Sequence, residues 1–298
     1  MKFLNKKLRE LKRRYKNYRR LNKKYRITPI EPWAFIRIKN EISTVQSCLE
    51  SIIPVIKKGV IGYHRLEENE VDDGTEKYIT EFCKKYSGFI LFKYDYNVIP
   101  ANDKRYTKLS NIPIENRLDS YYNAVLSKIP RNEWFIKIDC DHVYDTEKLR
   151  KLMYLPKKDT DVISYSRLNL HYENKKLYVI KNPTLFDVGD SWLLKNEDIY
   201  FDFFSGMKNG RFFAYEGIII PKNRKFYNTG LFNWHFPFIK ISRNIEKNNL
   251  IEYEKYNFSL YDKLYYHIEK DMIDKERILN ICKRFKINEK KDRNICKK

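Results

Sequence analysis

Two carboxylates stand where an apolar run of the sequence ends. Asp139-Cys140-Asp141-His142 follows the run at 133–138, which has the composition of a buried strand. On an extended backbone, residues two apart point to the same side, so Asp139 and Asp141 are expected to share one face while Cys140 and His142 turn to the other. Mg²⁺ and Mn²⁺ prefer oxygen ligands and take one or two carboxylates together with substrate phosphates. The pair therefore predicts a divalent-cation site, or else a solvated turn that caps a helix at 146–149.

A second Asp-x-Asp pattern, Asp159-Thr160-Asp161, has a different position. It precedes the apolar run at 162–165 and so stands where a strand begins. Ligands of open α/β sheets collect beyond the carboxyl ends of strands. We therefore interpret the second pair as a turn.

Strands and helices are expected to alternate through the first half of the chain. Apolar runs indicate strands at 33–38, 59–63, 89–94 and 133–138, and helical spacing indicates helices between 40 and 56, near 78–86 and at 115–129. This alternation predicts an α/β fold with a Rossmann-like, mostly parallel sheet flanked by helices. Short strands are expected at 162–167, 176–180, 191–194 and 211–213, and helices from 242 onward. We divide the chain into an extension (1–28), a main domain (29–241) and a C-terminal helical segment (242–298).

The positive charge is concentrated at the N-terminus. The 298 residues have a formal net charge of +21, and residues 1–26 hold thirteen Lys or Arg against Glu10 alone. Apolar residues there recur every three or four positions, interrupted by Asn22, which predicts a helix with one apolar stripe among cations. The stripe consists of Leu4, Leu8, Leu11, Tyr15, Tyr18 and Tyr25. Such a helix can lie on an anionic membrane surface, can pack on the protein or a partner, or can reflect the Lys-rich and Tyr-rich composition of the whole chain.

Other sequence features bound the location of the protein. No apolar run approaches the roughly 20 residues of a membrane-spanning helix, and the charged N-terminus lacks the apolar core of a signal peptide. The five cysteines are widely spread without C-x-x-C spacing, which argues against a disulfide framework or a zinc site. We expect a soluble or peripheral protein of the cytoplasm.

A series of short motifs extends over about residues 30–240. They are Pro32-Trp33-Ala34-Phe35-Ile36-Arg37, Lys39-Asn40-Glu41, Gly59-Val60-Ile61-Gly62-Tyr63, Ser120-Tyr121-Tyr122-Asn123, Ile136-Lys137-Ile138-Asp139, Asp141-His142, Ser164-Tyr165-Ser166-Arg167, Gly189-Asp190 and His235-Phe236-Pro237-Phe238. Together they resemble the bacterial β-1,4-N-acetylgalactosaminyltransferases that build ganglioside-like lipooligosaccharide heads. Two stretches depart from that family, namely the longer acidic segment at 64–71 and residues 182–220.

The resemblance implies a GT-A type glycosyltransferase fold and an inverting, β-1,4-linked transfer of N-acetylgalactosamine. The implied donor is UDP-N-acetylgalactosamine, and the implied acceptor is a galactose-containing, often sialylated lipooligosaccharide. A dependence on Mn²⁺ or Mg²⁺ also follows. The basic helix would then hold the enzyme on the cytoplasmic face of the bacterial inner membrane.

Individual residues are candidates for these roles. Asp141 is expected to bind the metal directly, and Asp139 to bind the metal, a metal-bound water or the ribose. His235 is a third candidate ligand, or else a histidine packed among aromatic residues. Inversion requires a base opposite the departing phosphate. Glu216 is the first candidate base and Asp190 the second, unless they are ordinary surface acids. The candidate donor-nucleotide contacts are Arg37, Asn40, Glu41, Asp73, Asn123 and Asp139.

Two other functions fit parts of the sequence. The same fold can use UDP-galactose or UDP-glucose, because a few pocket residues distinguish these donors. A basic nucleic-acid-binding protein would account for the charge. However, the cations are concentrated in one terminal stripe, and the strand-helix order contains no known nucleic-acid module. We therefore expect no nucleic-acid partner, and the sequence leaves the oligomeric state open.

Overall fold

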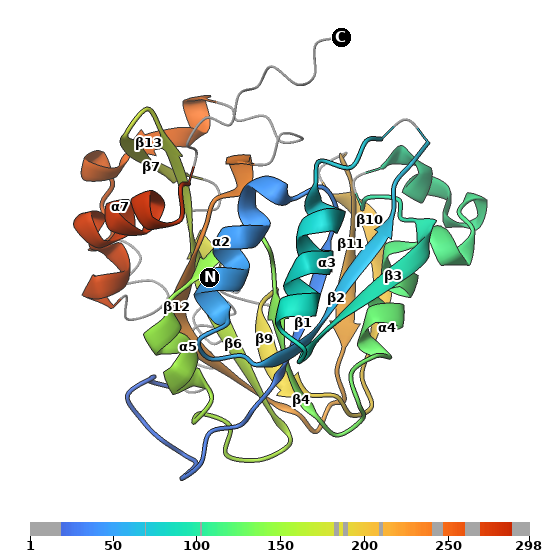
Figure 1. The fold of residues 1–298 in the computed structure, drawn as a ribbon, viewed down its shortest axis with the longest axis horizontal. Helices are drawn as coiled ribbons and strands as arrows, with labels where there is room; N and C mark the ends of the chain where they lie inside the picture. The colour runs from blue at the N-terminus through green and yellow to red at the C-terminus, as the bar shows by residue number, and fades with distance from the viewer. Residues whose placement is uncertain are drawn as a thin grey trace, which may run out of the picture.

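The computed structural model describes residues 19–68, 70–101, 103–181, 185–186, 190–208, 211–239, 247–259 and 269–287. Its centre is a sheet in which four strands run parallel in the order β4-β1-β2-β3 (Figure 1). These strands are β1 (Trp33–Ile38), β2 (Lys58–Arg65), β3 (Phe89–Asn97) and β4 (Trp134–Ile138). The helices between them are α2 (Ile42–Ile52), α3 (Thr75–Lys85) and α4 (Leu118–Leu126).

Helices cover both faces of these parallel strands. Ile36 and neighbouring side chains on one face pack with α2 and α3, and Phe35 on the other face packs with α4. Burial on both sides explains why the strands appear in the sequence as continuous apolar runs. The helix α4 lies so close to β2 that a Cβ atom at Gly62 would overlap Val125.

Antiparallel strands extend the sheet beyond β4. Continuing past β4, the order is β9 (Trp192–Lys195), β6 (Asp161–Glu173), β7 (Lys176–Ile180) and β13 (Leu250–Glu252). The short β8 (Leu185–Phe186) also pairs with β6. A further strand, β12 (Lys225–His235), runs parallel to β6 and pairs at its end with β5 (His142–Tyr144), which α5 (Thr146–Leu152) follows. The mixed α/β architecture with a mostly parallel central sheet confirms the expected fold class, which is that of a GT-A type fold.

A separate two-stranded hairpin stands beside α4. It consists of β10 (Tyr200–Lys208) and β11 (Arg211–Ile219). Its inner face packs on the 3₁₀ helix η1 (Lys104–Asn111), where the rings of Phe203 and Tyr106 are stacked with centroids 4.1 Å apart. The short η2 (Ile114–Asn116) joins η1 to α4. Only 211–213 of this hairpin was expected as strand.

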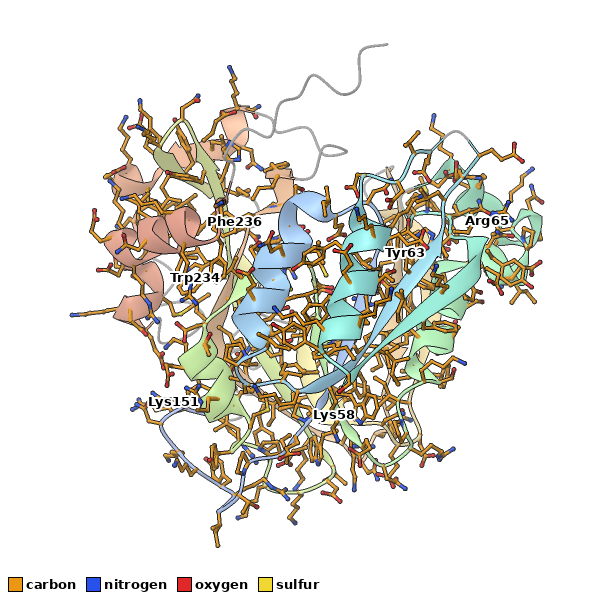
Figure 2. The ribbon with its side chains drawn as sticks, viewed as in Figure 1. Lys58, Tyr63, Arg65, Lys151, Trp234 and Phe236 are labelled. Atoms are coloured by element: carbon orange, nitrogen blue, oxygen red, sulfur yellow. The ribbon has the colours of Figure 1, made fainter. Side chains whose placement is uncertain are left out.

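The C-terminal part packs against β12. It contains η3 (Pro237–Ile239), η4 (Lys247–Asn249), η5 (Tyr253–Lys255), η6 (Lys270–Ile273) and α7 (Lys275–Arg284). Trp234 and Phe236 lie in the core that β12 forms with α7 (Figure 2), and the Trp234 indole donates to the Met272 carbonyl at 2.9 Å. In the described part of 242–298, α7 is an α-helix, whereas 250–252 form a strand.

The described part of the N-terminal extension is not helical. Residues 19–28 form turns and irregular backbone, and residues 1–18 of the expected basic helix lie outside the described residues. Arg19 is buried, forms an ion pair with Asp161 at 3.1 Å and lies over the ring of Tyr227. Asp161 also accepts backbone hydrogen bonds from Lys157 and Lys158, as the turn interpretation of the second Asp-x-Asp predicts.

The lengths of the helices and the states of the cysteines bear on two expectations from composition. None of the helices in the described part of the chain has the length and apolar character that a membrane crossing requires. The cysteines that the structure describes are free thiols. They are Cys48, Cys83, Cys140 and Cys282.

Candidate active site

The carboxyl ends of β1 and β4 open into a charged cavity of about 250 Å³. Strands β6, β11 and β12 supply its other walls. Its lining consists of Arg37, Glu41, Tyr122, Lys137, Asp139, Cys140, Asp141, His142, Arg167, Asp190, Glu216 and His235. Seven of the predicted site residues therefore meet at one place, where ligands of open α/β sheets are expected. These seven are Arg37, Glu41, Asp139, Asp141, Asp190, Glu216 and His235.

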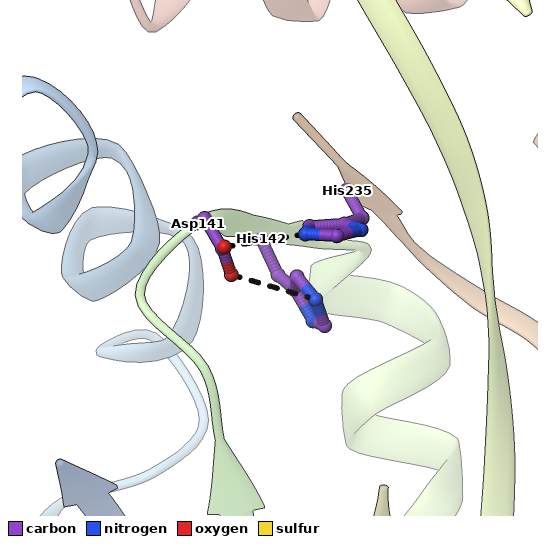
Figure 3. A group of neighbouring side chains, drawn as sticks. All are labelled: Asp141, His142 and His235. Carbon is purple, nitrogen blue, oxygen red and sulfur yellow. Dashed lines mark ion pairs between the residues drawn. The ribbon is translucent and has the colours of Figure 1, made fainter. Parts of the chain in front are cut away.

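Three buried side chains in this cavity form a potential metal-binding group (Figure 3). Oδ2 of Asp141 lies 3.2 Å from Nε2 of His235, and Oδ1 lies 3.7 Å from Nε2 of His142. One potential ligand atom from each residue lies within 4.8 Å of the others. A carboxylate and two imidazoles are a donor set suited to Mn²⁺ and other transition metals more than to Mg²⁺, which favours oxygen ligands.

Neighbouring side chains orient the two imidazoles. Nδ1 of His235 lies 2.7 Å from Oδ1 of Asn169, and because that amide oxygen only accepts, Nδ1 must carry the proton. The lone pair of His235 is then on Nε2, toward Asp141. Burial, together with the nearby His235, holds the pKa of His142 well below its usual range, so the ring is neutral, as a ligand must be.

The backbone at 139–141 explains why His142 joins this group. The strand β4 ends at Ile138, residues 140–141 form a turn, and the His142 amide donates to the Asp139 carbonyl at 3.2 Å. The expectation of an extended backbone here is wrong. Asp139 and Asp141 both line the cavity, but Asp139 is bound to Arg37 and Lys137, whereas Asp141 lies beside His142 and His235. Strand β5 then begins at His142, which pairs directly with His235 of β12.

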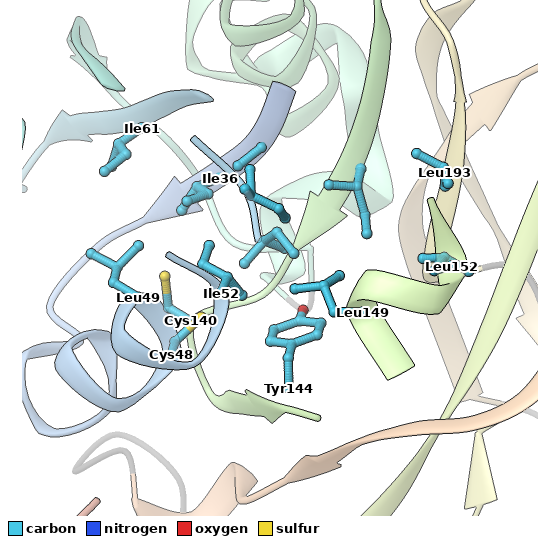
Figure 4. Packing of buried hydrophobic residues seen from close by; sticks show 14 of the residues in the cluster. Ile36, Cys48, Leu49, Ile52, Ile61, Cys140, Tyr144, Leu149, Leu152 and Leu193 are labelled. Atoms are coloured by element: carbon cyan, nitrogen blue, oxygen red, sulfur yellow. The ribbon is translucent and has the colours of Figure 1, made fainter. Parts of the chain in front are cut away.

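Side chains of the helix α2 hold this turn in place. The Cys48 thiol donates to the Asp139 carbonyl at 3.5 Å, and the Tyr144 amide donates to the Ser51 hydroxyl at 3.1 Å. Figure 4 shows Cys48 and Cys140 in the core, with Tyr144 nearby. The turn that carries Asp141 therefore rests on a packed core, which limits its movement.

Asp139 faces cations and lies outside the metal-binding group. Its Oδ1 accepts from Arg37 at 2.8 Å, and its Oδ2 accepts from Lys137 at 2.9 Å. Burial acts to raise the pKa of Asp139, but the charges of Lys137 and Arg37 outweigh it and bring the pKa below its usual value. Both oxygens of Asp139 are bound to side-chain cations, and its predicted role as a metal ligand stays a prediction.

Asp190 is held in the same way. Its Oδ1 lies 2.5 Å from the Lys137 ammonium, and its Oδ2 lies 2.5 Å from the Arg167 guanidinium. Burial acts to raise the pKa of Asp190, but Lys137 and Arg167 lower it far below its usual range. A carboxylate with so low a pKa accepts a proton poorly, which disfavours Asp190 as a general base. Side chains of alternating charge thus follow one another from Arg37 to Arg167.

Glu216 reaches the cavity from the inner face of β11. It is half-buried and shares a hydrogen bond with the Tyr122 hydroxyl. Its negative charge also acts to raise the pKa of Arg37. The Arg37 guanidinium lies over the Tyr122 ring at 3.9 Å from its centroid. Unlike Asp190, Glu216 is held by no ion pair among the described residues.

Three predicted donor contacts have other partners. Asp73 accepts from the Ile42 amide at 3.1 Å and from the Thr75 amide at 3.0 Å, so it connects the starts of α2 and α3. Asn40 donates to the Val71 carbonyl at 3.2 Å. Asn123 exchanges two hydrogen bonds with the Phe201 backbone and attaches β10 to α4. None of the three lines the cavity.

The sequence pattern missed several cavity residues. Lys137 is a single cation inside the buried strand β4. A lysine is rarely buried without a partner, so its position in the apolar run could have identified it as a candidate site residue. Arg167 and Asn169 are ordinary members of the long strand β6, and nothing in their spacing indicates that they approach Asp190 and His235. Their positions depend on pairing between strands that are distant in sequence.

The chain is similar to a known family of enzymes. A family model described as beta-1,4-N-acetylgalactosaminyltransferase (CgtA) matches residues 2–286, which is nearly the whole chain. No curated protein matches the chain at a significant level.

Proposed function

The chain belongs to the β-1,4-N-acetylgalactosaminyltransferase (CgtA) family, and we propose that it transfers the sugar from UDP-N-acetylgalactosamine, with inversion, to a galactose-containing lipooligosaccharide. The family makes the protein a glycosyltransferase that acts on a nucleotide-sugar donor and an acceptor. One observation carries the finer proposal. The buried group of Asp141, His142 and His235 lines the same cavity as the Glu216 carboxylate.

The cavity is suited to a divalent cation. Asp141, His142 and His235 would hold it, and the hydrogen bond from His235 to Asn169 is of the kind that orients metal-binding histidines. The two imidazoles favour Mn²⁺ over Mg²⁺. When bound, such an ion would act as a Lewis acid that neutralises charge on the departing diphosphate.

The cations of the cavity are suited to the donor's phosphates. Arg37, Lys137 and Arg167 outnumber their partners Asp139 and Asp190, so this row of side chains keeps an excess positive charge. We assign Asp139 and Asp190 to holding these cations in place before the substrate arrives.

Glu216 is the proposed general base. An inverting transfer needs a proton acceptor for the attacking hydroxyl on the side opposite the leaving phosphate. Glu216 comes from the hairpin, whereas the metal-binding group comes from β5, β12 and the turn before β5. The two therefore reach the cavity from separate elements. This separation suits a base and a phosphate-binding group that act on opposite sides of the sugar carbon.

We also propose that the N-terminal segment attaches the enzyme to an anionic membrane surface. Residues 1–18 contain eight Lys or Arg against Glu10 alone. Each basic residue near an anionic surface adds about 1 kcal/mol of attraction. The segment would continue from Arg19, whose amide donates to the Asn228 carbonyl at 2.7 Å.

A donor comparison tests the proposed reaction. Released UDP is measured with UDP-N-acetylgalactosamine, UDP-galactose and UDP-glucose, each with Mn²⁺ and a galactose-terminated acceptor, and the product linkage is determined by NMR. We expect acceptor-dependent release with the N-acetylgalactosamine donor and a β-1,4 product. Faster transfer from either of the other donors would assign the enzyme a different donor.

A further inference from the structure

The outer face of the β10–β11 hairpin carries exposed aromatic side chains. Because neighbouring residues of a strand point to opposite faces, Tyr215 points away from the cavity that Glu216 lines. Tyr215 is 50% exposed, Phe213 is 41% exposed and Phe204 is 37% exposed. We call these three side chains the aromatic platform. Contiguous exposed apolar groups of this kind commonly mark a binding surface.

The platform rings lie nearly parallel to one another. The Phe204 and Tyr215 rings are inclined by 19° with centroids 5.5 Å apart, and the Phe213 and Tyr215 rings are inclined by 20° with centroids 6.2 Å apart. Parallel rings in a row present a surface rather than separate protruding side chains.

Two glycines make this arrangement possible. A Cβ atom at Gly206 would lie 2.9 Å from the Phe213 ring, and one at Gly217 would lie 2.7 Å from the Phe204 ring. The rings therefore occupy the space that side chains at Gly206 and Gly217 would fill, an arrangement also used to protect glycines in designed strands. The platform rings thus pack against the backbone of their own hairpin at Gly206 and Gly217.

We propose that the aromatic platform binds a pyranose ring of the acceptor saccharide, at a position beyond the sugar that receives N-acetylgalactosamine. This inference rests on the proposed function. The face of a pyranose that carries axial C–H groups is apolar and slightly positive, and it matches the negative face of an aromatic ring. A β-1,4 transferase acts on a pyranose hydroxyl, so its acceptor has such faces.

The position of the platform agrees with an extended acceptor. Tyr215 directly precedes Glu216 in β11, so one strand places both the platform and the proposed base. In the described residues, β11 pairs only with β10, so no strand covers its other edge. Sugars that extend from the cavity can therefore pass this edge and reach the outer face.

The outer face also carries a polar hydrogen-bond acceptor. Asp202 pairs with Gly217, is exposed and lies on the same face as Phe204 and Tyr215. A carboxylate beside aromatic rings can accept hydrogen bonds from sugar hydroxyls. The face therefore combines an apolar surface with a polar acceptor, as a sugar ring requires.

The test compares acceptors of two lengths. For the full-length enzyme, kcat/KM is measured with methyl β-galactopyranoside and with a galactose-terminated tetrasaccharide. We expect Tyr215→Ala to lower the preference for the tetrasaccharide about fivefold, the loss of about 1 kcal/mol of aromatic contact, mainly through the acceptor KM. Tyr215→Phe should keep the preference, because the ring remains. Tyr96→Ala removes a similarly exposed tyrosine (48%) from β3 and should not change it.

Direct binding makes the outcome independent of turnover. Saturation-transfer NMR with the tetrasaccharide, without donor, should show contacts that Tyr215→Ala and Phe204→Ala each weaken. An unchanged preference with unchanged saccharide contacts would overturn the inference. Loss of binding to anionic phospholipid vesicles in Tyr215→Ala, with saccharide contacts intact, would assign the face to a membrane instead. If the wild type transfers to no acceptor, the proposed function fails, while the NMR experiment still decides whether the platform binds saccharide.

Discussion

Oδ1 of Asn169 lies 2.7 Å from Nδ1 of His235, and both side chains are buried. The two residues are opposite each other in the parallel pairing of β6 and β12. This contact places the proton on Nδ1 and turns Nε2 toward Asp141. Asn169 therefore prepares His235 to bind a cation even though it does not reach the cation itself.

Removal of the Asn169 amide should weaken metal binding. We expect Asn169→Ala to lower the affinity for Mn²⁺ about tenfold, because the His235 ring loses its fixed orientation. Electron paramagnetic resonance of free Mn²⁺ measures the affinity without turnover. Asn196→Ala is the matched control, since Asn196 is a buried amide that donates to the Ile129 carbonyl. Equal losses in both variants would mean that the effect is one of folding.

The two Asp-x-Asp patterns offer a second comparison. Asp141→Asn removes the only carboxylate of the metal-binding group and should lower kcat/KM on the order of 100-fold, with loss of Mn²⁺ binding. Asp159→Asn changes an exposed residue that is paired with Lys195 and should leave both quantities unchanged. Turnover and Mn²⁺ titration are measured on both variants. Full activity of Asp141→Asn with Mn²⁺ would exclude the proposed ligand role.

Glu216 and Asp190 should differ in the kinetic constant that they affect. Glu216→Gln keeps the size of the side chain but removes the proton acceptor, so kcat should fall on the order of 1,000-fold with little change in donor KM. Asp190→Asn should instead raise the donor KM, because Lys137 and Arg167 lose the carboxylate that orients them. Steady-state kinetics with varied donor distinguish the two. A fall in kcat alone for Asp190→Asn would transfer the base role to Asp190.

The parallel part of the fold could be predicted because its strands are buried on both faces. The runs that became β1, β2 and β4 are mostly apolar and buried, the run of β3 is apolar at its start, and the helices between them have clear periodicity. The hairpin was mostly missed, since its strands combine exposed aromatic residues with glycines and do not alternate regularly. Composition alone does not indicate that one face of β11 is buried on η1.

The candidate site could be predicted only in part. Asp141 and His235 were identified from a motif at a strand end and from the resemblance, whereas His142 was assigned to the wrong side. That error came from treating 139–142 as one strand, when the chain turns after Ile138 and starts β5 at His142. The pairing of His142 with His235 joins residues far apart in sequence, and no local pattern determines it.

Truncation should test the membrane proposal without damage to the fold. The deletion should end at residue 18, because the Arg19 side chain is buried against Asp161 and Tyr227. We expect the shortened enzyme to lose most of its binding to anionic phospholipid vesicles in co-sedimentation, while transfer to a soluble acceptor continues. Neutral phosphatidylcholine vesicles are the control. Unchanged sedimentation with anionic vesicles would show that residues 1–18 are not the anchor.

His64 should make the stability of the protein depend on pH. Burial is the main cause that lowers its pKa to about 4, and its Nδ1 lies 2.9 Å from the Arg65 carbonyl. In the unfolded chain the pKa is near the ordinary histidine value of about 6.5. Between these values the unfolded state binds more protons, so stability is complete above about pH 6.5 and falls as the pH decreases toward 4. The difference is about 3 kcal/mol at most.

His64→Leu should remove this part of the pH dependence. The variant is compared with the wild type by urea unfolding between pH 4 and pH 7, so that carboxylates titrating in both proteins cancel. The difference in unfolding free energy between the two proteins should change in favour of the variant as the pH falls below about 6.5. His171→Leu provides a second case, because burial also lowers the pKa of His171, although Glu173 opposes that effect. A constant difference across the whole range would mean that His64 is protonated equally in the folded and unfolded states.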